Sequence, residues 1–500
     1  MTHSTRQCAS FFVLLVFGAA TVVQSEDASL APDAPAEYEL KTELDVTGEY
    51  RATSEDVLIE DYKYKSGIDL MRSYFDRTPF ARAFLTFGAP AGVGVALGTA
   101  FRNIGEGDYY KADNLPSGQD GTLGLTHYLL TRGVLYYTAP DFSLAVGRDQ
   151  VDYSSGLEGS LLPSPRLPYL DTARAKILIG PFSIDWMVAS IQARENWENG
   201  YYSDNSYDVD PNQGLSPPIY GFEDDATATS VIEALHRWSL AFSQARVGAT
   251  AHIMYARRNN SYNLSDFFPF TSWHQAEMLG MNYSLIFDAT WEPFEGFKAM
   301  AQGGFDDISA RDIGLSDDDT PTIPAYVVGA NYAKELGPGE LSAYFETGYT
   351  HWLWGNYDGS QMVPWDVNPL LRFQYRMLMD SGSALLPLTS PYGPGAAWAE
   401  AKARYSLIGT GFSGGLGFLV LSKNEDANLI ATVFNNNKTT ADAHYLRDPP
   451  STLPPVHTRK ALVVSLVPGA MCKDGRWWFE ATMAVGLRLR GSMKVYDPHK

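Results

Sequence analysis

Residues 477–490, WWFEATMAVGLRLR, alternate apolar and polar side chains over a length that few soluble strands reach. Apolar side chains occupy the odd positions, whereas Glu480, Thr482, Arg488 and Arg490 occupy even positions. A period of two predicts a β-strand with one apolar and one polar face. Strands of soluble proteins usually run about five or six residues, and a strand that crosses a bilayer needs roughly nine to eleven. The length favours a membrane strand, although this stretch alone also allows a soluble sandwich.

The same alternation recurs along the chain, at residues 247–255, 285–291, 341–349 and 397–407. In each stretch the charged side chains stay on one face. A Lys or Arg that faces lipid at the bilayer midplane costs about 2–4 kcal/mol. The pattern therefore predicts apolar faces toward lipid and polar faces toward an enclosed interior.

Short and long connections alternate between these strands. Tight turns are expected at 88–92, 139–141, 180–181, 243–245, 292–296, 336–339 and 413–415, and long polar excursions at 104–123, 150–172, 192–231, 257–277, 307–323, 351–397 and 423–459. Outer-membrane barrels combine short periplasmic turns with long external loops, and their closed sheets leave no edge exposed to lipid. We predict an all-β fold, a transmembrane antiparallel β-barrel of outer-membrane type with about 16–18 strands. The first strand is expected near 43–51, and residues 428–434 are the candidate for a strand that the last hairpin lacks.

The N-terminus predicts export. Arg6 precedes an apolar core at 11–23 and a small-residue cleavage pattern at 23–25, so we expect a signal peptide at 1–25, an acidic periplasmic leader at 26–40 and the barrel at 41–500. Cleavage leaves only Cys472, which excludes an intramolecular disulfide and a thiolate metal cluster. The formal net charge of −20 argues against nucleic acid as a partner.

Four stretches carry a family resemblance. They are GRDQVDYSSG at 147–156 with GSLLPS at 159–164, HR at 236–237 before a hairpin at 239–255, FDATWEP at 287–293, and Gln302 with Asp306-Asp307-Ile308. In order and spacing they resemble the capsule-assembly Wzi family of outer-membrane barrels, surface lectins that hold capsular polysaccharide. The resemblance covers roughly residues 140–310, with Tyr153-Ser154 where the family tends to have Trp-Gly and without the family's periplasmic helical bundle. It implies a surface polysaccharide as the partner.

A barrel of this width must fill or wet its interior with inward side chains. We expect a lumen network of mixed charge. It comprises Arg148, Arg174, Lys176, His236, Arg237, Asp288, Asp306, Glu400, Arg404 and Arg488. Such charges either pair across the lumen and close it, or line a channel and impose ion preference.

Sugar recognition needs flat aromatic faces and planar hydrogen-bonding groups. Two expected long loops carry this mixture. The candidate carbohydrate-binding residues are Trp197, Tyr201, Tyr202, Asp204, Trp352, Trp354, Tyr357, Asp358 and Trp365. Aromatic residues near strand ends also anchor barrels at the membrane interface, which is the alternative role for them.

The sequence lacks the motifs of a zinc protease and of a P-loop nucleotide site. It has no His-Glu-x-x-His and no Gly-x-x-x-x-Gly-Lys-Ser/Thr. Asp317–Asp319 and the Asp208/Asp210 pair lack the glycine and closing Glu of a calcium loop. We therefore predict no enzyme activity, no cofactor and no bound metal.

The predicted function is that of a barrel in the cell outer membrane that binds or organises surface or capsular polysaccharide without catalysis. The alternative is a general or sugar-selective porin, and a third hypothesis is a soluble exported β-sandwich or adhesin. The expected partners are outer-membrane lipid, surface polysaccharide or small sugars, and the barrel-assembly machinery during insertion.

Overall fold

The computed structural model describes residues 38–46, 81–103, 117–120, 125–165, 170–192, 229–258, 264–267, 281–306, 308, 322–352, 354–355, 374–379, 382–408, 412–424, 458–471, 478–480 and 483–491. These residues form strands, turns and one short 3₁₀ helix, η5 (Leu264–Phe267). No helix among them is long and apolar enough to cross a membrane. The predicted strand at 428–434, most of the long excursions, the signal peptide and nearly all of the leader lie outside the described residues.

The first part of the chain contributes β1 (Glu39–Val46), β2 (Ala81–Gly88), β3 (Val93–Asn103), β4 (Ser117–Asp120), β5 (Leu125–Ala139), β6 (Phe142–Asp149), β7 (Leu170–Ile179), β8 (Phe182–Gln192), β9 (Thr229–Ala241) and β10 (Ala245–Arg258). The second part contributes β11 (Met281–Phe294), β12 (Phe297–Phe305), β13 (Pro324–Leu336), β14 (Gly339–Thr350), β15 (Gln374–Met379), β16 (Gly382–Pro387), β17 (Ala396–Leu407), β18 (Phe412–Asn424), β19 (Thr458–Met471), β20 (Trp478–Glu480) and β21 (Met483–Gly491). β15 and β16 form a separate hairpin.

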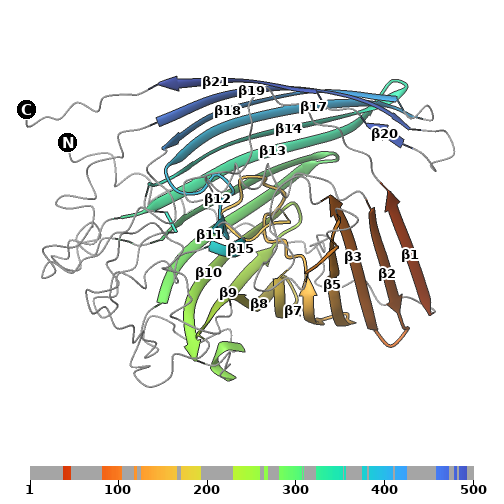
Figure 1. Ribbon diagram of the computed structural model, residues 1–500, viewed down its shortest axis with the longest axis vertical. Coiled ribbons are helices and arrows are strands. Elements are labelled where there is room, and N and C mark those ends of the chain that lie inside the picture. The colour runs from red at the N-terminus through yellow and green to blue at the C-terminus, as the bar shows by residue number, and fades with distance from the viewer. Residues whose placement is uncertain are drawn as a thin grey trace, which may run out of the picture.

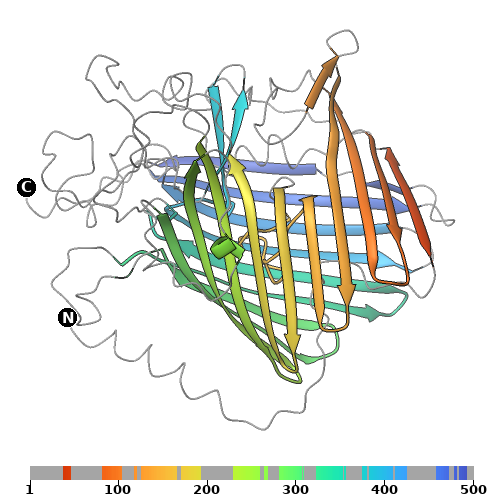
Figure 2. The ribbon, with the colours of Figure 1, turned by 90° about the horizontal axis from the view of Figure 1, so that it is seen from below.

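Nineteen strands form one antiparallel sheet in which neighbours along the chain pair in order. The sheet curves around an enclosed space (Figures 1 and 2). β4 pairs only with β5 and adds no position of its own to the sheet. β20 and β21 pair with β19 in one shared register and so count as one interrupted strand. The nineteen strands therefore occupy seventeen successive positions around the sheet. This confirms the predicted barrel of outer-membrane type, within the expected range of strands. Among the described residues no ladder joins β1 to β21, which are the two ends of the sheet.

Six of the seven predicted tight turns are confirmed, for example the turn between β11 and β12. There Gly296 has φ +81°, and a Cβ on it would lie 2.0 Å from the Ala333 carbonyl oxygen, so this turn requires glycine. The turn predicted at 413–415 is wrong, because these residues already pair with β17 at the start of β18. The first strand begins earlier than predicted, at Glu39.

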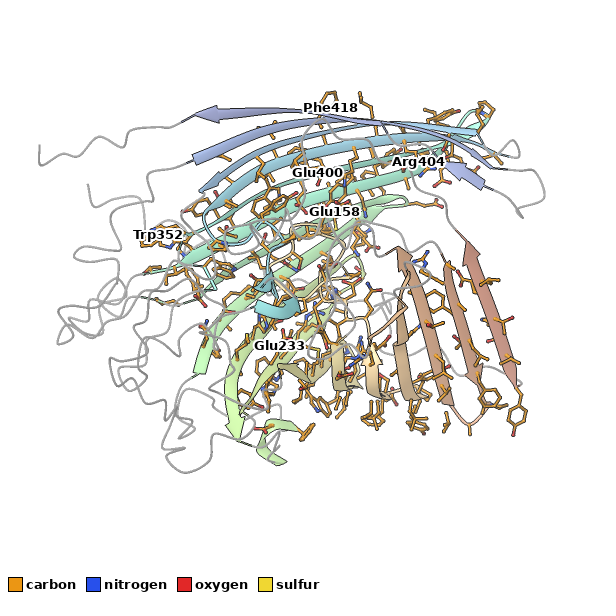
Figure 3. All side chains as sticks on the ribbon, viewed as in Figure 1. Glu158, Glu233, Trp352, Glu400, Arg404 and Phe418 are labelled. Carbon is orange, nitrogen blue, oxygen red and sulfur yellow. The ribbon has the colours of Figure 1, made fainter. Side chains whose placement is uncertain are left out.

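The two faces of the sheet differ as the alternation predicts. On β13, Tyr326 and Val328 are 52% and 50% exposed, whereas Ala325 and Val327 are 2% and 0% exposed. The exposed outer face is thus apolar and the inner face is buried. Figure 3 shows Phe418 on the outer side of β18 and Glu400 on the inner side of β17. This arrangement suits a barrel surrounded by hydrocarbon.

Candidate functional site in the barrel lumen

Residues 150–165, the plug segment, lie inside the enclosed space and not outside it (Figure 2). The expectation that 150–172 forms an external loop is therefore wrong for these residues. The physical reason is burial of apolar side chains. Leu157, Leu161 and Leu162 are at most 2% exposed, and wall side chains satisfy the backbone of the segment.

A compact turn begins the plug segment. The Asp152 carboxylate accepts from the Ser154 amide at 2.9 Å and from the Ser154 hydroxyl at 2.7 Å. The same hydroxyl accepts from the Gly156 amide at 3.0 Å. Ser155 adopts φ +59°, a left-handed conformation that short polar residues tolerate. The sequence YSSG thereby reverses the chain inside the lumen.

Gln302 of β12 holds two separate stretches of the plug segment, 153–154 and 160–161. Its side-chain oxygen accepts from the Leu161 amide at 2.7 Å and from the Ser160 hydroxyl at 3.0 Å. Its side-chain nitrogen donates to the carbonyl oxygens of Tyr153 and Ser154 at 3.3 and 3.2 Å. One buried amide thus uses its donor and acceptor groups to fix backbone groups seven residues apart or more.

Glu346 of β14 is the second anchor and is fully buried. Both carboxylate oxygens accept from the Gly159 amide at 3.0 Å. The carboxylate also accepts from the Tyr344 hydroxyl and from the Trp398 indole nitrogen, each at 2.6 Å. Hydrogen bonds from neutral donors to a charged carboxylate are stronger than those between neutral groups, so this contact fixes the plug against β14 and β17.

Further contacts attach the plug segment around the wall. The Lys402 ammonium of β17 lies 2.6 Å from the Glu158 carboxylate, which Figure 3 shows on the enclosed side. The Tyr344 hydroxyl accepts from the Glu158 amide at 2.9 Å. On another side of the lumen, Arg246 of β10 donates to the Ser155 hydroxyl at 3.4 Å. The plug segment leaves β6 and reaches β10, β12, β14 and β17, so it crosses the lumen.

A mixed-charge wall on β5–β11 faces the plug segment. Arg174 pairs with Asp149, which also accepts from Arg132 at 2.8 Å. Arg237 donates to both oxygens of Asp288, at 3.3 and 2.7 Å. Lys176 and Asp185 are buried beside these pairs. The described side chains therefore pair along this wall.

The plug adds a buried phenol to this wall. Burial raises the pKa of the Tyr153 hydroxyl well above its usual range, and the nearby Asp185 carboxylate adds to the rise. The hydroxyl therefore stays neutral, which fits its position between cationic and anionic side chains.

The structure locates the predicted lumen residues on two different faces. Arg174, Lys176, Arg237, Asp288, Asp306 and Glu400 lie on the inner face, as predicted, and are at most 9% exposed. Arg404 also takes an inner position on β17 but is exposed near the short turn, where it donates to Ser413 at 2.8 Å. Position 488 shares the inner face through the register of β18, β19 and β21.

The prediction that Arg148 lies in the lumen is wrong, because Arg148 shares the outer face of β6 with Val146. It donates to both carboxylate oxygens of Asp171, at 2.8 and 2.6 Å. The pair lies at the end of the strand farthest from the short turns, where an outward charge can reach water.

The prediction that His236 lies in the lumen is also wrong, since His236 shares the outer face of β9 with Trp238. η5 covers this part of the outer wall. Phe267 packs against the apolar cluster of Val188, Ile232, Ala234, Ala251, Ile253 and Tyr255, and the His236 imidazole donates to the backbone of Asp266. A polar side chain is tolerated there because protein, not lipid, surrounds it.

Of the predicted sugar-binding residues, the structure describes Trp352 and Trp354. They are 6% and 1% exposed, and the Trp354 indole nitrogen donates to the Thr389 hydroxyl at 3.2 Å. Their aromatic faces are thus packed against protein. The other candidates lie outside the described residues: Trp197, Tyr201, Tyr202, Asp204, Tyr357, Asp358 and Trp365.

The predicted lumen network contains neither Gln302 nor Glu346, the two residues that anchor the plug segment. An inward Gln carries no charge, and the periodicity of β14 marks Glu346 only as inward. The motifs GSLLPS and Gln302 appear in the resemblance, which was the available signal for their contact. Within the described residues, no group of three or more His, Cys, Asp or Glu side chains has the arrangement of a metal site.

Comparisons with known proteins find similarity at the level of three-dimensional structure. No family model and no curated protein matches the sequence. The chain is similar to Wzi of Escherichia coli, described as a carbohydrate-binding β-barrel involved in group 1 capsule assembly, with 11% identity, coverage of 83% of this chain and 80% of that chain, and a TM-score of 0.46.

Porins show a weaker similarity. OccK2 of Pseudomonas aeruginosa, solved in complex with glucuronate, has 9% identity, coverage of 82% and 86%, and a TM-score of 0.36. A BenF-like porin from Pseudomonas fluorescens has 9% identity, coverage of 83% and 89%, and a TM-score of 0.35. At TM-scores below 0.5 these similarities do not decide between the functions.

Proposed function

We propose that this chain is an outer-membrane β-barrel that binds or organises surface or capsular polysaccharide without catalysing a reaction. The plug segment is the observation that carries the proposal. Gln302 and Glu346 hold its backbone across the lumen through buried hydrogen bonds. A lumen crossed in this way supports a barrel whose external surface acts on its partner, in preference to an open diffusion channel.

The proposed polysaccharide contacts are the aromatic and acidic residues of the long loops: Trp197, Tyr201, Tyr202, Asp204, Tyr357, Asp358 and Trp365. Trp352 and Trp354 belong to the same proposal as supports, because their burial lets them hold the base of such a surface. Aromatic rings present flat apolar faces to the C–H groups of sugars, and carboxylates accept from their hydroxyls.

We further propose a location in the cell outer membrane after cleavage of residues 1–25, with residues 26–40 as a periplasmic leader. Outer-membrane lipid would contact the apolar outer face, and the barrel-assembly machinery would insert the chain. Detergent-dependent extraction with the outer-membrane fraction, heat-modifiable gel mobility and N-terminal sequencing test these points. Release of the mature chain without detergent would contradict them and favour a soluble sandwich.

The second candidate function is a general or sugar-selective porin. It is favoured by the mixed-charge wall, since Arg174, Arg237 and Asp288 face the same lumen that the plug segment narrows. Planar-bilayer recording separates the two functions. The proposal predicts an electrically silent wild-type barrel that immobilised capsular polysaccharide retains, and loss of retention when 196–205 or 351–368 is replaced. Steady conductance without retention would support the porin.

A further inference from the structure

We propose that the plug segment is an acid-sensitive gate, which closes the lumen while Glu346 is ionised and loosens when Glu346 takes up a proton. The inference goes beyond the proposed function, because it gives the barrel a conducting state at low pH. It concerns the contact of the plug segment with β14 and β17 and does not depend on the polysaccharide partner.

The hydrogen-bond partners of the Glu346 carboxylate in the described part of the chain are all donors. The Gly159 amide and the Trp398 indole nitrogen can only donate. The Tyr344 hydroxyl donates to Glu346 at 2.6 Å, and its oxygen already accepts from the Glu158 amide at 2.9 Å. The site therefore fits a carboxylate, which only accepts hydrogen bonds. It does not fit a carboxylic acid, whose O–H group must itself find an acceptor.

The charges beside Glu346 are mostly negative. Lys402 supplies the ammonium of this group, which lies 2.6 Å from the Glu158 carboxylate and 3.0 Å from the Glu400 carboxylate. Glu400 lies directly opposite Glu346 in the register of β14 and β17. Among these described side chains, named here the Glu346 cluster, three carboxylates thus adjoin one ammonium. The cluster carries negative charge in excess, and uptake of a proton lowers that excess.

Water reaches the Glu346 cluster from the short-turn end of the barrel. The inner positions of β14 and β17 become more exposed toward that end. In order they are Gly348–Trp398 and Glu346–Glu400, which are buried, Tyr344–Lys402, which is partly exposed, and Ser342–Arg404, which is exposed. Figure 3 labels Glu400 and Arg404 along β17.

The Glu346 cluster therefore lies at the boundary between a poorly hydrated and a hydrated part of the lumen. The Glu158 and Lys402 side chains are 29% and 40% exposed, whereas Glu346 is fully buried. A proton from water thus arrives next to Glu346 without crossing the plug segment.

Protonation of Glu346 weakens the hold on the plug segment. The added proton occupies one carboxyl oxygen, so Gly159, Tyr344 and Trp398 then compete for fewer acceptor positions. Hydrogen bonds to a charged carboxylate are also stronger than those to its neutral form. Gln302 still holds the plug segment from β12. The part of the plug segment that faces β14 and β17 is therefore the part that moves.

The test is planar-bilayer recording of the purified full-length barrel from about pH 7 to about pH 3 and back, which covers the titration range of carboxyl groups. Glu346→Gln keeps the shape of the protonated side chain and has no charge at any pH. Tyr344→Phe keeps the carboxylate and removes one of its donors. The control is Glu292→Gln, because the Glu292 side chain is 54% exposed and lies 3.7 Å from Lys298. Heat-modifiable mobility must match wild type in each variant and at each pH.

Wild type and Glu292→Gln are expected to be silent at neutral pH and to open reversibly in acid. The open-channel time should rise at least about tenfold, which corresponds to about 1.4 kcal/mol. Glu346→Gln should already conduct at neutral pH and show no further rise in acid. Tyr344→Phe should open at a higher pH than wild type, because one donor fewer stabilises the charged carboxylate.

Three outcomes would overturn the inference. In the first, wild type stays silent at every pH or already conducts steadily at neutral pH. In the second, Glu346→Gln is silent at neutral pH and opens in acid as wild type does, which would assign the acid response to another group. In the third, which decides if Glu346→Gln does not fold, Tyr344→Phe opens at the same pH as wild type.

Discussion

The amide of Gly159 donates to both carboxylate oxygens of Glu346 at 3.0 Å, across 187 positions of sequence. A Cβ on Gly159 would lie 2.5 Å from the Trp398 ring and 2.6 Å from Glu346 Oε1. Any residue larger than glycine at position 159 would thus displace the buried Trp398 ring or the Glu346 carboxylate.

Gly159→Ala is therefore expected to loosen the plug segment and to produce conductance in planar bilayers where wild type is silent. Gly414→Ala is the matched control, since nothing lies within 4 Å of a Cβ there. Channels of equal size and frequency in wild type, Gly159→Ala and Gly414→Ala would mean that the plug segment does not close the lumen.

Asp288→Asn is expected to destabilise the barrel by about 3–5 kcal/mol, because it leaves the buried Arg237 without its charged partner. Lys298→Ala is the control. Lys298 and Glu292 lie 3.7 Å apart and are partly exposed, so its loss should cost at most about 1 kcal/mol. Urea unfolding in lipid vesicles measures both. Similar small losses would show that the wall is hydrated.

Val328→Lys tests whether the outer face meets hydrocarbon. Val328 lies within β13 and Leu336 at its short-turn end, and both are at least 50% exposed on the outside. Lysine should cost about 2–4 kcal/mol near the midplane and about 0–1 near the interface. Unfolding in vesicles should therefore show a larger loss for Val328→Lys than for Leu336→Lys. Equal small losses would favour a soluble sandwich.

His351 makes the end of β14 sensitive to acid. Burial lowers the pKa of His351 to about 4, below its usual value of 6.5. The unfolded chain therefore binds this proton first as pH falls, and the folded state loses stability from about pH 6.5 down to about 4. The free energy of unfolding should decrease over this range less steeply in His351→Gln than in wild type. Identical slopes would contradict the buried, neutral imidazole.

The strands and their faces were predictable because alternation is a local property. Phe345 and Glu346 fall on opposite faces of β14, as the period of two requires. The strand register likewise assigns position 488 to the inner face. The plug segment was not predictable in this way. Its partners Gln302 and Glu346 lie more than 140 residues away, and its glycines and serines have the composition of an external loop.

The two errors in the lumen network share a physical cause. Charge was expected on the inner face, but an outward charge is expensive only where lipid contacts it. Arg148 lies at a strand end and pairs with Asp171, while His236 lies beneath η5. The alternation of side chains gives the face of the sheet on which a residue lies. It gives neither the depth of that residue in the membrane nor whether a distant segment covers it.

The cover over the outer wall at η5 also bears on how such a barrel would rest in a bilayer. Ile253 and Tyr255 point outward yet are fully buried, so acyl chains cannot wet them. On the opposite side, Val420 stays 55% exposed at a comparable distance along its strand. The apolar surface that lipid can contact is therefore uneven around the barrel. Beside β8–β10 the lipid would have to lie nearer the short turns than it does beside β18. A flat bilayer meets both conditions only if the barrel axis tilts away from the membrane normal.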